Sequence, residues 1–96
     1  MLVALAEFPV KKGKESEFLA WFAWSNAEFA KFKGFISRRL LKPQGEGNYT
    51  ALIEFENLAD FKAVGDSPFH SVSARRILPL LDGNLAPRLY EEEVLA

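Results

Sequence analysis

The stretch Leu2–Phe8, with the sequence LVALAEF, is apolar at nearly every position, so both of its alternating faces are apolar. A strand has this composition when it lies in the middle of a sheet and is covered on both sides. The stretch Tyr49–Phe55, YTALIEF, shares the property through Ala51, Leu52 and Ile53. The two stretches predict two buried central strands, and the rest of the fold is built around them.

Two further stretches have the charged character of edge strands. Phe35–Lys42 carries Arg38 and Arg39, and a turn cluster at residues 43–48 joins it to the second central strand as a hairpin. Pro87–Val94 carries three consecutive glutamates and predicts a final charged strand. The sheet is therefore expected to have two central and two edge strands.

Helices are predicted between these strands. A long helix is expected from about Lys14 to Lys33, with Gly34 as its C-terminal glycine. Its apolar face is an aromatic stripe at steps of three and four residues, formed by Phe18, Phe22, Ser25, Phe29 and Phe32. Trp24 falls on the polar side of this helix, where it predicts either an interface contact or a helix-end anchor.

The second helical region is interrupted. Asn57 is a plausible N-cap for a short helix that Gly65 stops. Ser67 and Pro68 then start another helix, because proline at the first helical position loses no hydrogen bond, and Pro79 ends or kinks it.

The order β-α-β-β-α-β predicts an α+β, ferredoxin-like domain spanning residues 1–96, with its helices on one face of the sheet. The other face then needs a second protein layer. A chain of 96 residues without cysteine also has a marginal core and no disulfides to support it. Both arguments predict a homodimer, paired through the open sheet face.

Composition excludes several functional classes. A net charge of −1 with interspersed charges gives no field for nucleic acid, and no apolar stretch approaches the roughly 20 residues of a membrane span. The absence of cysteine removes thiol nucleophiles and thiolate metal sites. No phosphate loop or cluster of metal ligands is present, so no metal or cofactor is expected. A cytoplasmic location is the default expectation.

Several local motifs, in this order, resemble the antibiotic biosynthesis monooxygenase family of dimeric α+β barrels. They are Met1–Glu7 followed by Gly13, Gly34 with Phe35, the stretch Ile53–Ala63, and Ser67 with Pro68. The resemblance implies a ferredoxin-like homodimer that acts as a cofactor-independent monooxygenase on an aromatic substrate such as a quinol or anthrone.

The chain departs from the family pattern at positions that carry chemistry in many members. Phe55 stands where many have tryptophan, and Val64 where many have histidine. The haem-degrading branch's histidine aligns with Ser73, and its asparagine has no counterpart near Ala6, so haem degradation is not expected. A non-catalytic homodimer that binds a small molecule or serves as a scaffold is therefore the alternative function.

The resemblance and the residue types suggest His70 and Trp21 as catalytic residues. His70 is the only histidine, and its helical position could turn it toward the space between helix and sheet. Imidazole titrates near neutral pH and can deprotonate a phenolic hydroxyl, the step that oxygenation without a cofactor needs. The alternative for His70 is a partly exposed helix residue bonded to backbone.

A substrate pocket is expected among apolar side chains, because such a site must exclude water and hold a flat ring. Arg38 and Arg39 point to opposite faces of their strand, so that one can enter the interior and bind a substrate oxyanion, while ordinary edge-strand charges are the alternative. Core packing is the alternative for the apolar candidates. The candidate pocket residues are Phe18, Phe22, Arg39, Phe55 and Val64.

Overall fold

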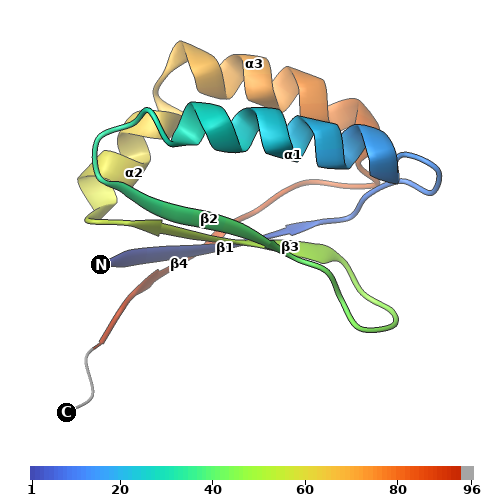
Figure 1. Ribbon diagram of the computed structural model, residues 1–96, viewed down its shortest axis with the longest axis horizontal. Coiled ribbons are helices and arrows are strands. Elements are labelled where there is room, and N and C mark those ends of the chain that lie inside the picture. The colour runs from blue at the N-terminus through green and yellow to red at the C-terminus, as the bar shows by residue number, and fades with distance from the viewer. Residues whose placement is uncertain (94–96) are drawn as a thin grey trace.

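The computed structural model describes residues 1–93 and consists of one antiparallel sheet with helices packed on one side of it (Figure 1). The elements agree in type and order with the β-α-β-β-α-β prediction. In chain order they are β1 (Leu2–Phe8), α1 (Glu15–Phe29), β2 (Phe35–Leu41), β3 (Tyr49–Phe55), α2 (Leu58–Gly65), α3 (Pro68–Ile77), the 3-10 turn η1 (Leu78–Leu80) and β4 (Arg88–Glu91).

The four strands lie in the order β2-β3-β1-β4, so β1 and β3 are central as predicted. In the register of β1 with β3, Ala4 lies opposite Ile53 and Leu5 opposite Leu52. Directly opposed residues share a face, so Ala4 and Ile53 point to one side and Leu5 and Leu52 to the other.

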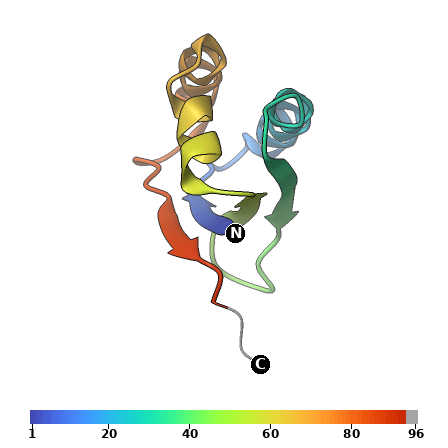
Figure 2. The same ribbon diagram turned by 90° about the vertical axis from the view of Figure 1, so that its left-hand side faces the viewer.

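All the helices cover the same face of the sheet (Figure 2). On that face the side chains of β1 and β3 are buried: Leu2, Ala4, Ala6 and Phe8 from β1, and Tyr49, Ala51, Ile53 and Phe55 from β3. On the opposite, open face, Val3, Leu5 and Leu52 are only half-buried. The sheet therefore has a covered face that forms the core and an open face that does not.

Helix α1 ends at Phe29, four residues before the predicted Lys33. The last turn tightens because the Phe32 amide donates to the Phe29 carbonyl, only three residues back, at 3.0 Å. Gly34 lies beyond the helix, with φ +82°, and the Asp60 side chain leaves no space for a Cβ there. Its role is to turn the chain into β2.

The predicted caps of the later helices are present. Asn57 accepts a hydrogen bond from the Asp60 amide at 2.8 Å, and Ser67 caps α3 with Pro68 in its first turn. Pro79 lies in the 3-10 turn η1 that follows α3. Within residues 1–93, no helix has the length and apolar character needed to cross a membrane.

Strand β4 is shorter than the predicted Pro87–Val94, since it spans Arg88–Glu91 and Val94 lies outside the described residues. It pairs with β1, with Leu5 opposite Arg88 and Leu2 opposite Glu91. Beyond the strand, the Glu92 amide still donates to the Met1 carbonyl at 2.9 Å.

Candidate functional site

Arg38 is the arginine that enters the interior. It lies opposite the buried Ile53 on the covered face, and its side chain is 6% exposed. Arg39 lies opposite Leu52 and is exposed on the open face. Arg39 was expected in the substrate pocket, but Arg38 occupies the interior position. An irregularity in the pairing between Phe35 and Ser37 determines which side chains of β2 face the helices.

The Arg38 guanidinium is held by neutral acceptors on α1. Its Nη1 donates to the Ser25 hydroxyl at 3.0 Å, to the Phe22 carbonyl at 3.4 Å and to the Asn26 side-chain oxygen at 3.5 Å. Its Nε is buried and has no hydrogen-bond partner among residues 1–93. No ion pair in that part of the chain includes Arg38, so its positive charge is not compensated.

Three aromatic rings surround this cation. The guanidinium carbon lies 4.0 Å from the ring centre of Phe22, 4.5 Å from that of Phe29 and 5.5 Å from that of Trp21. Rings attract a cation through their negative faces, but they do not hydrate it. Burial therefore lowers the pKa of Arg38 to about 9, since desolvation disfavours the charged form.

Three of the predicted site residues, Phe18, Trp21 and Phe22, come together beneath α1. The ring of Phe18 stacks on that of Trp21 at 5.9 Å and is tilted to that of Phe22 at 6.4 Å. Phe8 from β1 completes the group, 5.7 Å from Trp21. The Trp21 indole N–H donates to the Ser73 carbonyl at 3.1 Å and so fixes its ring between α1 and α3.

Phe55 and Val64 lie in the same core but away from this group. Phe55 is fully buried and packs against Phe29, Phe35 and Phe61, with ring centres 6.3, 5.7 and 5.6 Å away. Val64 is buried on α2. Phe29 links the two groups of rings, because it contacts both Phe55 and Arg38.

His70 is exposed, so the expectation that it turns toward the space between helix and sheet is corrected. The inward stripe of α3 is formed by Phe69, Ser73 and Ile77 at steps of four residues. His70 follows Phe69 by one residue, about 100° around the helix, and therefore faces away. The aromatic groups thus have no histidine beside them.

Trp24 packs against α3 rather than anchoring a helix end. Its ring lies 5.6 Å from that of Phe69, and the Arg76 guanidinium stacks on it at 4.3 Å. Beside this pair runs a shallow groove of about 320 Å³ between α1 and α3, lined by Glu17, Ala20, Trp21, Trp24, Arg76 and Leu80.

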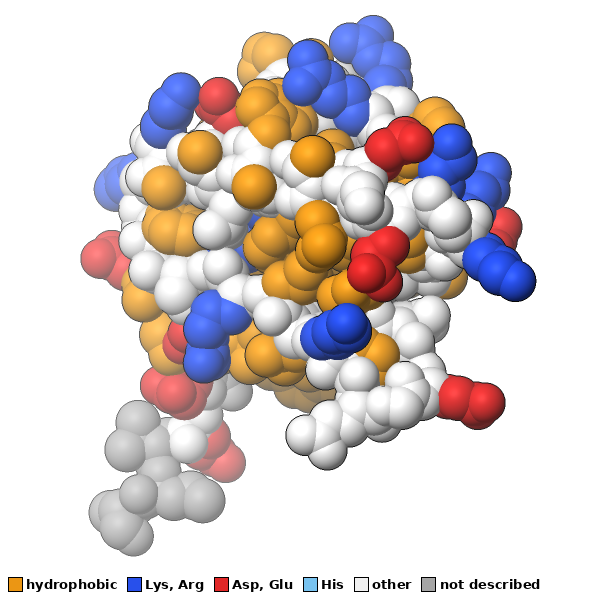
Figure 3. Space-filling view, turned by 45° about the vertical axis from the view of Figure 1, so that its right-hand side comes forward, with side chains coloured by type: hydrophobic (Ala, Val, Ile, Leu, Met, Phe, Trp, Pro, Cys, Tyr) orange, Lys and Arg blue, Asp and Glu red, His pale blue; other side chains and the backbone are white. Residues whose placement is uncertain are grey.

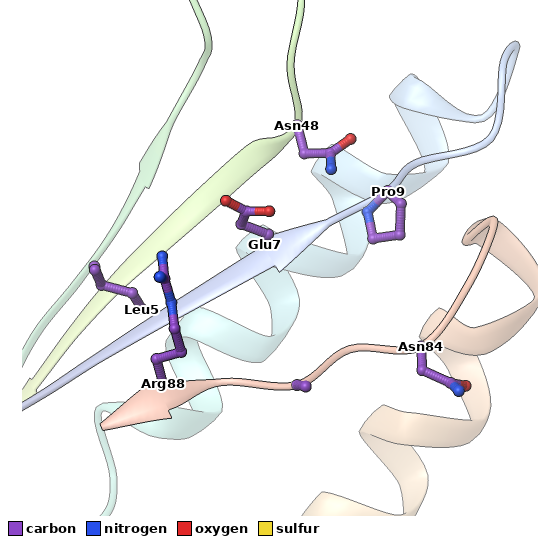
Figure 4. Close-up of a pocket in the computed structure, with 7 residues that line it drawn as sticks. Leu5, Glu7, Pro9, Asn48, Asn84 and Arg88 are labelled. Atoms are coloured by element: carbon purple, nitrogen blue, oxygen red, sulfur yellow. The ribbon is translucent and has the colours of Figure 1, made fainter. Parts of the chain in front are cut away.

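A second hollow, of about 360 Å³, lies on the open face near the ends of β1 and β4. Figure 4 looks onto that face, with the helices behind the sheet, and Glu7 and Arg88 extend over β1 on the near side. Leu5, Pro9, Asn48, Asn84 and Ala86 complete its lining. This hollow is polar and separate from the aromatic groups under α1.

Figure 3 shows apolar side chains gathered in the middle of one face of the molecule, with acidic and basic side chains around them. Several large apolar side chains are among the exposed residues, including Leu19 on α1 at 41% and Leu41 on β2 at 46%. Leu19 is thus exposed on α1, whereas Leu41 lies opposite Thr50 and adds apolar surface to the open face.

Sequence reasoning did not single out Arg38, Phe29 and Ser25 as one site. A signal was present in α1, where Ser25 interrupts an aromatic stripe. A small hydroxyl residue there leaves room for a long side chain and offers it an acceptor.

The family model described as antibiotic biosynthesis monooxygenase matches residues 1–75, which include β1 to β3 and most of α3. A search of curated proteins finds no match.

Solved structures with the same fold include Rv0793 from Mycobacterium tuberculosis, 15% identical, with a TM-score of 0.87 over 99% of this chain and 97% of that one. SnoaB, a cofactor-independent oxygenase from Streptomyces nogalater, is 21% identical, with a TM-score of 0.86 over 98% and 94%. A conserved protein from Methanosarcina mazei is 18% identical, with a TM-score of 0.88 over 96% and 92%. At these identities, the likeness concerns the fold.

Proposed function

Because this chain belongs to the antibiotic biosynthesis monooxygenase family, we propose that it is a cofactor-independent monooxygenase acting on a small aromatic substrate of the quinol or anthrone type. Such a substrate reacts with oxygen once a hydroxyl on its ring is ionised, which makes the ring electron-rich. The observation that carries the proposal is a buried cation enclosed by aromatic rings in a chain of this family.

The covered face has the apolar character that this chemistry requires, although its rings fill the space and a substrate would have to displace at least one of them. Phe18, Trp21 and Phe22 form an apolar surface next to Arg38, and a flat ring can stack on such residues. A dry environment strengthens electrostatic contacts and protects reactive intermediates from water. We assign Trp21 to the substrate site, because it contacts both the aromatic group and the cation.

We further propose that the protein is a homodimer paired through the open face. Val3, Leu5 and Leu52 form a half-buried apolar centre there, and Tyr90 beside them is 46% exposed. A second copy would remove this apolar surface from water, which is the main favourable term in association.

The test is oxygen consumption by purified protein, freed of metal and flavin, with a panel of quinols and anthrones. The expected result is a rate that is proportional to protein concentration and saturates with at least one substrate. The variant Arg39→Met should retain the rate of oxygen consumption, since Arg39 lies on the open face and not among the covered aromatic rings. No acceleration with any substrate of the panel would contradict the proposal.

A non-catalytic homodimer that binds a small aromatic molecule is the second candidate. It is favoured by the exposure of His70 and by Phe55 and Val64, which stand where many family members have tryptophan and histidine. Saturable binding of a substrate analogue without oxygen consumption would support this candidate over the first.

A further inference from the structure

We propose that Arg38 is the anion-binding residue of the site, and that the ligand is bound as a phenolate or enolate whose oxygen accepts hydrogen bonds from its guanidinium. The proposal rests on the proposed function for the aromatic nature of the ligand. It adds the ionisation state in which the ligand is bound and the residue that selects that state.

Burial of the Arg38 charge is costly. An ion loses several kcal/mol of hydration on burial unless a counter-charge and hydrogen bonds replace the water. Within residues 1–93 Arg38 has only neutral acceptors, and the ion pairs found there join other residues, Met1 with Glu91, Lys14 with Glu17 and Lys31 with Glu28. An anionic ligand would supply the missing charge.

Within residues 1–93, Arg38 also has an unsatisfied hydrogen-bond donor, its Nε. Buried polar groups in proteins nearly always have a hydrogen-bond partner. Arg38 Nε has none among the described residues, whereas Nη1 has three acceptors on α1. A phenolate oxygen in the plane of the guanidinium would accept from Nε in a charge-assisted bond.

The surroundings of Arg38 are aromatic. Phe22 and Phe29 lie closest to the guanidinium, with Trp21 slightly further away, so an aromatic ring bound to Arg38 would lie against other rings. Since these rings now fill the space, binding requires rotation of at least one of them, a change that is common on complex formation. β2 is an edge strand, which places Arg38 near the border of the sheet rather than at its centre.

The experiment compares two probes of nearly the same size. They are 4-nitrophenol, above the pH at which it ionises and below the pKa of Arg38, and nitrobenzene, which has no hydroxyl. Affinities are measured by isothermal titration calorimetry with the full chain. The wild-type protein should bind 4-nitrophenolate about tenfold or more tightly than nitrobenzene, the scale of a hydrogen bond to a charged group.

Three variants test whether Arg38 causes the preference for 4-nitrophenolate over nitrobenzene. Arg38→Met should lose about tenfold or more in affinity for 4-nitrophenolate while its affinity for nitrobenzene stays the same. Arg38→Lys keeps the charge without the planar fork and should retain part of the preference. Arg39→Met, the matched control on the open face, should bind both probes as the wild type does.

Equal affinity of the wild-type protein for both probes would overturn the proposal, and this comparison does not depend on the folding of any variant. Unchanged 4-nitrophenolate binding by a folded Arg38→Met would overturn it as well. Failure of the oxygenase proposal has a different signature, since Arg38-dependent phenolate binding would then persist without oxygen consumption.

Discussion

Arg38 and Arg39 are neighbours on the same strand, yet they belong to two different environments. Arg38 lies under α1 among aromatic rings, with an unpaired Nε. Arg39 is exposed on the open face of the single chain, where the nearby Ser37 hydroxyl donates to Glu54 at 2.6 Å. The strand contributes one charge to a dry interior and one to a surface that we expect to meet a second copy.

Burial of apolar surface alone does not explain which residues form the covered face. Its apolar residues are stabilised by leaving water, whereas Arg38 is destabilised by the same transfer. A buried residue that costs stability is explained most simply by a contribution to function. The open face has the opposite character, since its apolar residues are only half-buried and would gain stability from the proposed partner copy.

The largest loss of stability is expected for Phe55→Ala. Phe55 is fully buried among Phe29, Phe35 and Phe61, so its truncation should lower the free energy of unfolding by about 3–5 kcal/mol. Urea denaturation followed by circular dichroism measures the change. Leu52→Ala on the open face is the control and should cost less. A Phe55→Ala variant no less stable than Leu52→Ala would break the distinction between the faces.

The second effect concerns the open face. Leu52→Glu places a charge at the centre of the proposed dimer interface, where burial of an unpaired charge costs about 3–5 kcal/mol and so prevents association. Light scattering after size exclusion should show a dimer for the wild-type chain and a monomer for this variant. Leu19→Glu, on the exposed side of α1, should leave the dimer intact. A monomeric wild-type chain at micromolar concentration would refute the assignment of the open face.

Arg38→Met should raise the free energy of unfolding by about 1–4 kcal/mol, since an apolar side chain of similar length replaces an uncompensated charge. Urea denaturation at neutral pH measures the change, and Arg39→Met should be nearly neutral. A marked loss of stability in Arg38→Met would identify Arg38 as a structural residue.

The difference in stability between the wild-type protein and Arg38→Met should depend on pH. The pKa of Arg38 is lowered from its ordinary value to about 9 in the folded chain, so above pH 9 the unfolded chain binds more protons than the folded chain does. The destabilisation by Arg38 is fully present below pH 9 and decreases as the pH rises above it toward the ordinary pKa of arginine. The stabilities of the wild type and Arg38→Met should therefore converge in alkaline solution, and a constant difference would contradict the unpaired charge.

The smallest effect concerns the turn that leads into β2. Gly34→Ala should cost about 1–2 kcal/mol for its left-handed backbone, and more because the Asp60 side chain occupies the space of the new Cβ. Gly13→Ala has a similar φ with no atom nearby, so it should cost only the backbone part. Thermal unfolding of the two variants gives the comparison. Equal costs would mean that Asp60 does not constrain the start of β2.

The central strands were predictable because β1 and β3 are apolar on both faces, a pattern typical of strands that are covered on both sides. The caps at Asn57 and Ser67 were also predictable, since their side chains act on amides within the same turn. These features depend on neighbouring residues, which a sequence displays directly.

The interior of the site was less predictable. Which arginine turns inward depends on the pairing irregularity between Phe35 and Ser37, and a shift of one residue reverses the faces of a strand. The exposure of His70 depends on the rotation of α3, which its contacts to α1 through Phe69 determine. Both features arise from tertiary packing, so they cannot be predicted from the local sequence pattern.

A crystal structure of the protein with bound 4-nitrophenolate tests the difference between the two faces most directly. We predict the phenolate oxygen within hydrogen-bond distance of Arg38 Nε, the ring against Phe22 or Phe29, and a second copy over Val3, Leu5 and Leu52. A phenolate in the groove beside Trp24 and Arg76, or on the open face, with Arg38 still unpaired, would contradict this assignment.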